Sequence, residues 1–312
     1  MFLGSTAAWP LAALAQPRAR MPVIGYLVLG NPEPSFSFFK EGLRKLGYMD
    51  GRDVQIEFRS AEGKSERLAG LAADLVRLKI DILVAAQTPA VTAAKRATRR
   101  IPIVMAGVGD PVGTGIIASL ARPGGNITGI SGTGTEMGAK TLELVREVIP
   151  AAKRVAVLAN ATDPFTKPFL EQLQRAGRRL SLEIAPIMVR ETSEFAAAFR
   201  DMVKRRTDFV IVQPSLQRRI AAEMALQHQL PAVSPQGTFP PEGGLMSYSA
   251  ILADLQRESA VYVDKILKGA RPADLPVQLP TKFELIVNLK TATALGIKFP
   301  HSVLLRADKV IE

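Results

Sequence analysis

A small oxygen-bearing side chain stands directly before a proline at Thr88-Pro89, Asp110-Pro111 and Asp163-Pro164. A hydroxyl or carboxylate followed by proline at the first helical position is typical of a helix start. Helix starts offer free N–H groups and a favourable dipole, so Thr88 predicts a site for a ligand carboxylate. Either aspartate could be a simple cap, or one of them could pair with a ligand ammonium.

Further polar side chains follow predicted strands, where a ligand could contact them. These candidates are Asn31, Gln87, Ser131, Thr133 and Asn160, with Gln213, Ser215, Gln236 and Tyr248 later in the chain. Phe165 could stack on an aromatic ligand or pack in the core. No Lys or Arg stands within two or three positions of these strand ends, so a highly anionic ligand would lack compensation. The set therefore predicts a zwitterionic amino acid rather than a phosphate or tricarboxylate.

Motifs for catalysis are incomplete. The chain has no cysteine, and His228 and His301 do not stand in a metal-ligand spacing. Residues 129–133 resemble a nucleophile elbow but end in Thr133 instead of glycine. Residues 138–141 resemble a phosphate loop, yet Ala139 separates the glycine from the lysine. We therefore expect no catalytic residues, metal or cofactor.

The elements that must position these residues occur in two similar sets. Apolar runs typical of buried strands stand at residues 23–27, 54–58, 80–84 and 101–105, separated by helical stretches. The pattern restarts at residues 155–159, 183–189, 209–212 and 230–234, an offset of about 130 residues. Such alternation predicts an α/β fold of two doubly wound parallel-sheet lobes. Ligands of open α/β sheets bind beyond the carboxyl ends of the strands, so we expect a ligand between the lobes.

Composition supports two soluble globular domains. The 312 residues are 47% hydrophobic and 22% charged, and 40 Lys and Arg against 29 Asp and Glu give a net charge of +11. That charge raises the question of a nucleic-acid partner. The basic residues are spread over helices of both halves without interleaved aromatic residues, which indicates a solvated surface and no nucleic-acid partner.

The first residues differ from the rest. Residues 2–15 are uncharged and alanine-rich, and Ala13-Leu14-Ala15 has the small-x-small pattern of signal-peptidase cleavage. No basic residue precedes Arg18, so we expect a truncated signal peptide and spacer over residues 1–20, with the true start upstream. A disordered tail is the alternative. The signal peptide predicts a periplasmic protein, and the absence of cysteine is compatible with that compartment.

Several motifs resemble the ABC-transporter substrate-binding protein family. They stand at residues 41–48, 71–76, 101–104, 109–115, 119–129, 243–248, 281–285 and 288–292. The run Ala121-Arg-Pro-Gly-Gly-Asn126 is the most specific of them. The resemblance implies a type I periplasmic binding protein fold with two lobes, three hinge crossings and a permease partner in the inner membrane. Characterised relatives bind amino acids, aromatic ones among them.

Three short extended segments are candidates for the hinge: residues 126–130, 244–248 and 272–280. Such segments can absorb the backbone rotation of lobe closure, although ordinary linkers would look similar. The first lobe is then residues 21–128 plus 249–275. The second lobe is residues 129–248 plus 276–312.

Together these features predict an exported solute-binding protein of an ABC importer. It would be a monomer that captures a small polar ligand, namely an amino acid, aromatic ones included, and delivers it to a permease. Closure would follow from the ligand's greater affinity for the closed form. The alternative is the ligand-sensing module of a transcription regulator or a signalling receptor. A transcription regulator should begin with a DNA-binding helix pair, whereas this chain begins with an apolar leader.

Overall fold

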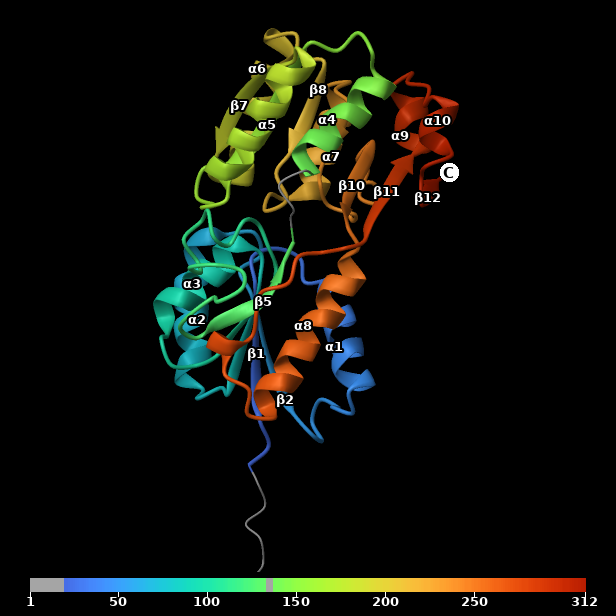
Figure 1. The fold of residues 1–312 in the computed structure, drawn as a ribbon. Helices are drawn as coiled ribbons and strands as arrows, with labels where there is room; N and C mark the ends of the chain where they lie inside the picture. Colours follow the sequence, from blue (N-terminus) through green and yellow to red (C-terminus); the bar gives the residue numbers. More distant parts are fainter. Residues whose placement is uncertain (1–19, 133–136) are drawn as a thin grey trace, which may run out of the picture.

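The computed structural model describes residues 20–132 and 137–312, which form two lobes stacked end to end (Figure 1). The predicted cleavage site at Ala13-Leu14-Ala15 and the candidate ligand residue Thr133 lie outside these ranges. Both lobes are open sheets with helices on both faces, as the sequence predicts. No helix among the described residues is long and apolar enough to cross a membrane.

The sheet of the first lobe is fully parallel and has the strand order β2-β1-β3-β4-β5. Its strands are β1 (Val23–Val28), β2 (Gln55–Ser60), β3 (Ile82–Ala86), β4 (Ile103–Val108) and β5 (Ile127–Ser131). Helices α1 (Ser35–Lys45) and α8 (Leu252–Leu267) pack together on one face. Helices α2 (Leu68–Arg77) and α3 (Thr88–Ala97) cover the other face. Both faces are thus buried, which explains the continuous apolar runs of these strands.

The second lobe contains a sheet of order β12-β11-β10-β9-β8-β6-β7. Its strands are β6 (Arg154–Asn160), β7 (Glu183–Val189), β8 (Phe209–Val212), β9 (Ala232–Val233), β10 (Met246–Ala250), β11 (Phe283–Asn288) and β12 (Lys309–Ile311). Its helices are α4 (Met137–Val148), α5 (Thr166–Leu180), α6 (Phe195–Lys204), α7 (Arg218–Gln227), α9 (Leu289–Ala294) and α10 (His301–Leu304). Short 3₁₀ helices stand at Ser65–Arg67, Thr192–Glu194 and Pro272–Asp274.

One strand pair departs from the all-parallel prediction, because β10 and β11 are antiparallel. Strand β10 leads out of the second lobe into α8 of the first, and β11 brings the chain back (Figure 1). Two neighbouring strands that run to and from the same hinge must point in opposite directions. The antiparallel pair is therefore a consequence of the double crossing.

The hinge lies a few residues from the predicted boundaries. Strand β5 stays in the first sheet as far as Ser131, and its backbone pairs with Gln278, whose N–H donates to Gly129. Residues 129–131 and 277–278 thus belong to the first lobe, while Ser249 and Ala250 still pair in the second sheet. The extended segments in the sequence mark the crossings, but backbone pairing decides where each lobe ends.

Candidate functional site

A cavity lies between the lobes at the carboxyl ends of the central strands. The first lobe contributes Gln87, Thr88 and Gly109, and the second contributes Asp163 and Arg218 among others. The centre of a water molecule can lie in about 80 Å³ of this space. A single water needs about 10–15 Å³ of such volume, so the cavity has room for roughly five to eight waters. A cavity of this volume suits one small molecule.

Direct contacts between the lobes hold the cavity closed. The Phe165 ring of the second lobe lies against Gly109 of the first, so close that a Cβ on Gly109 would come within 2.6 Å of the ring. Gln87 Nε2 donates to the Pro214 carbonyl across the cleft at 3.4 Å. Gln217 Nε2 reaches back to the Glu62 carbonyl at 3.1 Å. The structure is therefore the closed form of the two-lobed molecule.

Thr88 lies in the cavity wall, but its predicted role as a helix cap is wrong. Helix α3 begins at Thr88 itself, with Gln87 in the capping position at φ 73° and no side-chain cap. The Thr88 hydroxyl instead accepts a hydrogen bond from the Gly109 N–H at 3.2 Å. The Thr88 hydroxyl thus binds the end of the neighbouring strand β4 rather than its own helix. It therefore positions the Gly109 loop on which Phe165 packs.

Asp163 is one of two acidic residues that line the cavity, together with Glu33. Its Oδ1 accepts from the Phe165 N–H at 2.8 Å, and its Oδ2 accepts from Gln213 Nε2 at 2.9 Å. Burial raises the pKa of Asp163, although hydrogen bonds from Ser215, Phe165 and Gln213 oppose that rise. A carboxylate destabilised by burial gains from a cationic partner, so a ligand ammonium would suit this position.

Gln213 and Asn160 support Asp163 from behind instead of lining the cavity. Gln213 Oε1 accepts from the Asn160 N–H at 2.7 Å and from the Thr166 hydroxyl at 2.9 Å. Both side chains are buried. The amide that binds Asp163 is therefore fixed in orientation, because its oxygen already has two donors.

Arg218, at the start of α7, is a site residue that the sequence reasoning missed. Its side chain is 10% exposed, and its Nη2 pairs with Glu242 Oε1 at 3.2 Å. Its Nε is buried and has no hydrogen-bond partner in the described part of the chain, and the same holds for Gln87 Oε1. Both residues line the cavity, and within the described ranges neither Arg218 Nε nor Gln87 Oε1 has a protein partner. Arg218 stands six residues after the end of β8 at Val212, beyond the two or three positions after the strand ends that the sequence analysis considered.

The other sequence candidates divide between two hollows. Ser215 and Gln236 line the cavity, and Asn31 lies at its rim, where it accepts from the Glu33 N–H. Asp110, Ser131 and Tyr248 line a separate hollow beside the hinge. There Asp110 caps a turn by accepting from the Gly113 N–H at 2.8 Å, so its predicted cap serves a turn and not a helix.

A second group of missed residues lines the end of the cavity nearest the hinge. Thr238, Ser249 and Gln256 are its polar members, and Leu252 and Leu255 are apolar. Sequence spacing did not reveal them, because they follow the hinge crossing or lie in a loop rather than immediately after a central strand.

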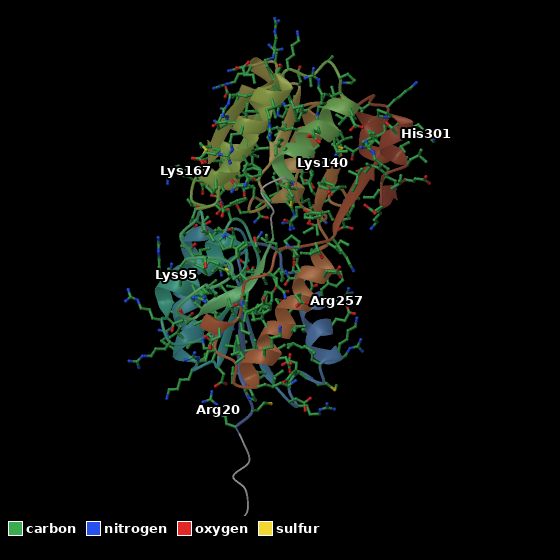
Figure 2. The ribbon with its side chains drawn as sticks, viewed as in Figure 1. Arg20, Lys95, Lys140, Lys167, Arg257 and His301 are labelled. Carbon is green, nitrogen blue, oxygen red and sulfur yellow. The ribbon has the colours of Figure 1, made fainter. Side chains whose placement is uncertain are left out.

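Basic side chains occur on both lobes. Figure 2 labels Lys140 and Lys167 on the second lobe and Lys95 and Arg257 on the first, and Arg175, Arg178 and Arg179 line a further hollow on α5. No cluster of potential metal ligands occurs within residues 20–132 and 137–312.

Residues 35–311 match the ABC transporter substrate binding protein family, and the chain belongs to that family. It is 29% identical over 267 residues to a tyrosine-binding protein of Clostridioides difficile strain R20291, covering 83% of this chain and 76% of the relative. This confirms the resemblance seen in the sequence.

Two solved structures share the fold. One is an ABC domain from Streptococcus pneumonia in complex with L-Trp, 28% identical, with a TM-score of 0.85 over 93% of this chain and 99% of that chain. The other is the ligand-free, open structure of a substrate-binding protein from Clostridium difficile, 24% identical, with a TM-score of 0.65 over 93% and 99%. The predicted two-lobed α/β class is thereby confirmed.

Proposed function

We propose that this protein is the extracytoplasmic receptor of an ABC importer, and that it captures a free amino acid in the closed cleft and delivers it to a permease. Aromatic amino acids are the first candidates. The observation that carries the proposal is that Arg218, Gln87 and Asp163 line one cavity, while Arg218 Nε and Gln87 Oε1 have no hydrogen-bond partner among the described residues. A charged donor beside a carboxylate and an amide oxygen matches the two charged groups of an amino acid.

The head group of the ligand would lie among these three residues. Its carboxylate would accept from Arg218 Nε, a strong charge-assisted hydrogen bond in a buried site. Its ammonium would donate to Asp163 and to Gln87 Oε1, which lowers the cost of burying the Asp163 charge. Because Gln87 belongs to the first lobe and Arg218 to the second, the ligand would bridge the lobes.

The rest of the cavity suits an apolar side chain. Val28, Ala86, Ala106, Leu252 and Leu255 form an apolar wall from the first lobe, and Phe165 faces the cavity from the second. A ring placed there would bury apolar surface, worth about 25 cal/mol per Å². This wall supports an aromatic amino acid, as do the relatives that bind tyrosine and L-Trp.

Closure would provide the signal to the permease. A ligand that contacts both lobes binds the closed form more tightly, so it shifts the population towards closure. The closed surface, which brings Gln217 to Glu62, differs from any open form. The chain's own groups bind and orient the ligand, and no chemical step is required of them.

A thermal-shift screen tests this proposal. A ligand that binds only the native state raises the midpoint of unfolding by mass action. We expect aromatic L-amino acids to raise it and sugars, phosphate and tricarboxylates to leave it unchanged. A shift with phosphate or sugars alone would contradict the proposal.

Export is a separate part of the proposal. If Ala13-Leu14-Ala15 is cleaved, protein recovered from the cell envelope should begin at Gln16. N-terminal sequencing of envelope and cytosolic fractions distinguishes the cases. An intact Met1 terminus found in the cytosol alone would contradict export.

A further inference from the structure

The hinge end of the cavity carries polar groups that an amino-acid head group does not use. Ser249 Oγ and Thr238 Oγ1 are buried and have no hydrogen-bond partner among the described residues. Gln256 is 2% exposed and lines the same cavity. Buried polar groups are normally hydrogen-bonded, so three of them at one end of a cavity call for a ligand group that satisfies them.

The orientation of Gln256 is set from behind by Tyr26. The Tyr26 hydroxyl donates to Gln256 Oε1 at 3.0 Å, and its ring is fully buried. Burial, together with the nearby charge of Glu33, raises the pKa of Tyr26, so the phenol keeps its proton and remains a donor. With its oxygen occupied, Gln256 has its Nε2 left to donate, and no partner for Nε2 occurs within residues 20–132 and 137–312.

These three residues line the same cavity as Arg218, Gln87 and Asp163 but are not part of that head-group set. Ser249 and Gln256 stand on either side of one hinge crossing, and a Cβ on Gly237, next to Thr238, would lie 3.2 Å from Ser249 Oγ. Arg218 pairs with Glu242 of the turn that also carries Thr238, so the head-group residue and this polar set are joined through one loop. The cavity thus combines charged residues, an apolar wall and a second set of polar groups.

We propose that Gln256, with Ser249 and Thr238, selects a ligand whose apolar side chain ends in a hydrogen-bond acceptor, as the phenol of tyrosine does. The inference rests on the proposed amino-acid binding function. A phenol oxygen accepts from Gln256 Nε2 while its hydrogen donates to Ser249 or Thr238. The indole of tryptophan can only donate, and phenylalanine can do neither.

The expected order of affinity is therefore tyrosine, then tryptophan, then phenylalanine. Phenylalanine would leave the amide and both hydroxyls unpaired in a dry cavity, a penalty that sites built for a hydroxyl impose strongly. We expect tyrosine to bind at least about 100-fold more tightly than phenylalanine, which is below the strongest discrimination known for such sites.

The test is calorimetric titration of the full chain with L-tyrosine, L-tryptophan and L-phenylalanine. Gln256→Leu should weaken tyrosine binding by about 10- to 100-fold and leave phenylalanine binding unchanged or stronger. Ser249→Ala should act in the same direction. Gln227→Leu, at an exposed position of α7, is the matched control and should leave all three affinities unchanged.

A second variant covers the case in which Gln256→Leu fails to fold. Tyr26→Phe keeps Gln256 and the cavity wall but removes the hydrogen bond that orients the amide. It should reduce the preference for tyrosine over phenylalanine. Equal weakening of tyrosine and phenylalanine by Gln256→Leu, or equal affinity of the native protein for both, would overturn this inference and leave the proposed function intact. Failure of every amino acid to bind would overturn the proposed function itself.

Discussion

The ring of Phe165 packs on Gly109 across the cleft, with no room between them for a methyl group. The two residues come from different lobes, so the contact exists only when the lobes are closed. The Gly109 N–H is bound by Thr88 and the Phe165 N–H by Asp163, which fixes both sides of the contact. The absence of a side chain at position 109 is thus a condition for closure.

Gly109→Ala should block closure. A Cβ at this position would meet three ring atoms of Phe165 at 2.6–2.7 Å, and the backbone there needs no glycine-specific conformation. Small-angle scattering should show a radius of gyration that shrinks with ligand for the native protein but stays large for the variant. Gly30→Ala, where nothing lies within 4 Å, is the control and should close normally. Normal compaction of Gly109→Ala would contradict the closing role of this contact.

Arg218→Gln should weaken amino-acid binding. Loss of one hydrogen bond to a charged group costs about 1.5–3 kcal/mol, which corresponds to a roughly 10- to 150-fold higher Kd. Arg219→Gln, the exposed next residue, should have no effect and serves as control. Calorimetry decides the matter, and an unchanged Kd for Arg218→Gln would remove this arginine from the carboxylate site.

Affinity should fall as the pH is lowered from neutral into the acid range. The pKa of Asp163 is raised above its ordinary value by burial, so this carboxylate takes up a proton within a window above that value. A neutral Asp163 no longer pairs with the ammonium, while the ligand's own groups keep their charges over this range. Ligand titrations at several pH values should show affinity decreasing with falling pH in the native protein. The decrease should be smaller in Asp163→Asn.

In the ligand-free protein, the raised pKa of Asp163 makes the free energy of unfolding rise as the pH is lowered, whereas the ligand affinity falls. Because the folded state binds the Asp163 proton more readily than the unfolded state, its contribution to stability rises as pH falls through the window. Unfolding of native protein and Asp163→Asn in denaturant, without ligand, measures this difference. A contribution from Asp163 that declines on acidification would contradict the burial of an uncompensated carboxylate.

Thr88→Val should lower the free energy of unfolding by about 1–3 kcal/mol, because the buried Gly109 N–H loses its acceptor. Binding should weaken as well, since the Gly109 loop is then less firmly placed. Thr92→Val, one turn further along α3, removes a hydroxyl that only donates to a helix carbonyl. Denaturant unfolding should therefore show a smaller decrease in the free energy of unfolding for Thr92→Val than for Thr88→Val. Equal losses would argue against a special role for Thr88.

The fold could be predicted because its signals are local and repeated. The apolar strands of both sheets and the helices between them recur along the chain, and burial on both faces makes each strand a continuous apolar run. The antiparallel pairing of β10 and β11 could not be predicted this way. It depends on where the chain crosses between lobes, which neither strand encodes by itself.

The site was only partly predictable, for a related reason. Asp163, Thr88 and Ser215 directly follow central strands, so the rule for α/β sheets places them in the cleft. Arg218 enters from a helix start beyond the strand end, and Gln256 from α8 after the chain has crossed back to the first lobe. A cation at the first position of a helix after a cleft strand was the available signal for Arg218. For Gln256 no local signal exists.

The central claim is that one amino acid is held by its charged groups from both lobes at once. Titration calorimetry with L-tyrosine, tyramine and 3-(4-hydroxyphenyl)propanoate tests it most directly, because the last two compounds each lack one charged group. We expect saturable one-to-one binding of tyrosine. Both analogues should bind at least about tenfold more weakly, because each loses one hydrogen bond that involves a charged group. Equal affinity for tyrosine and either analogue would contradict it.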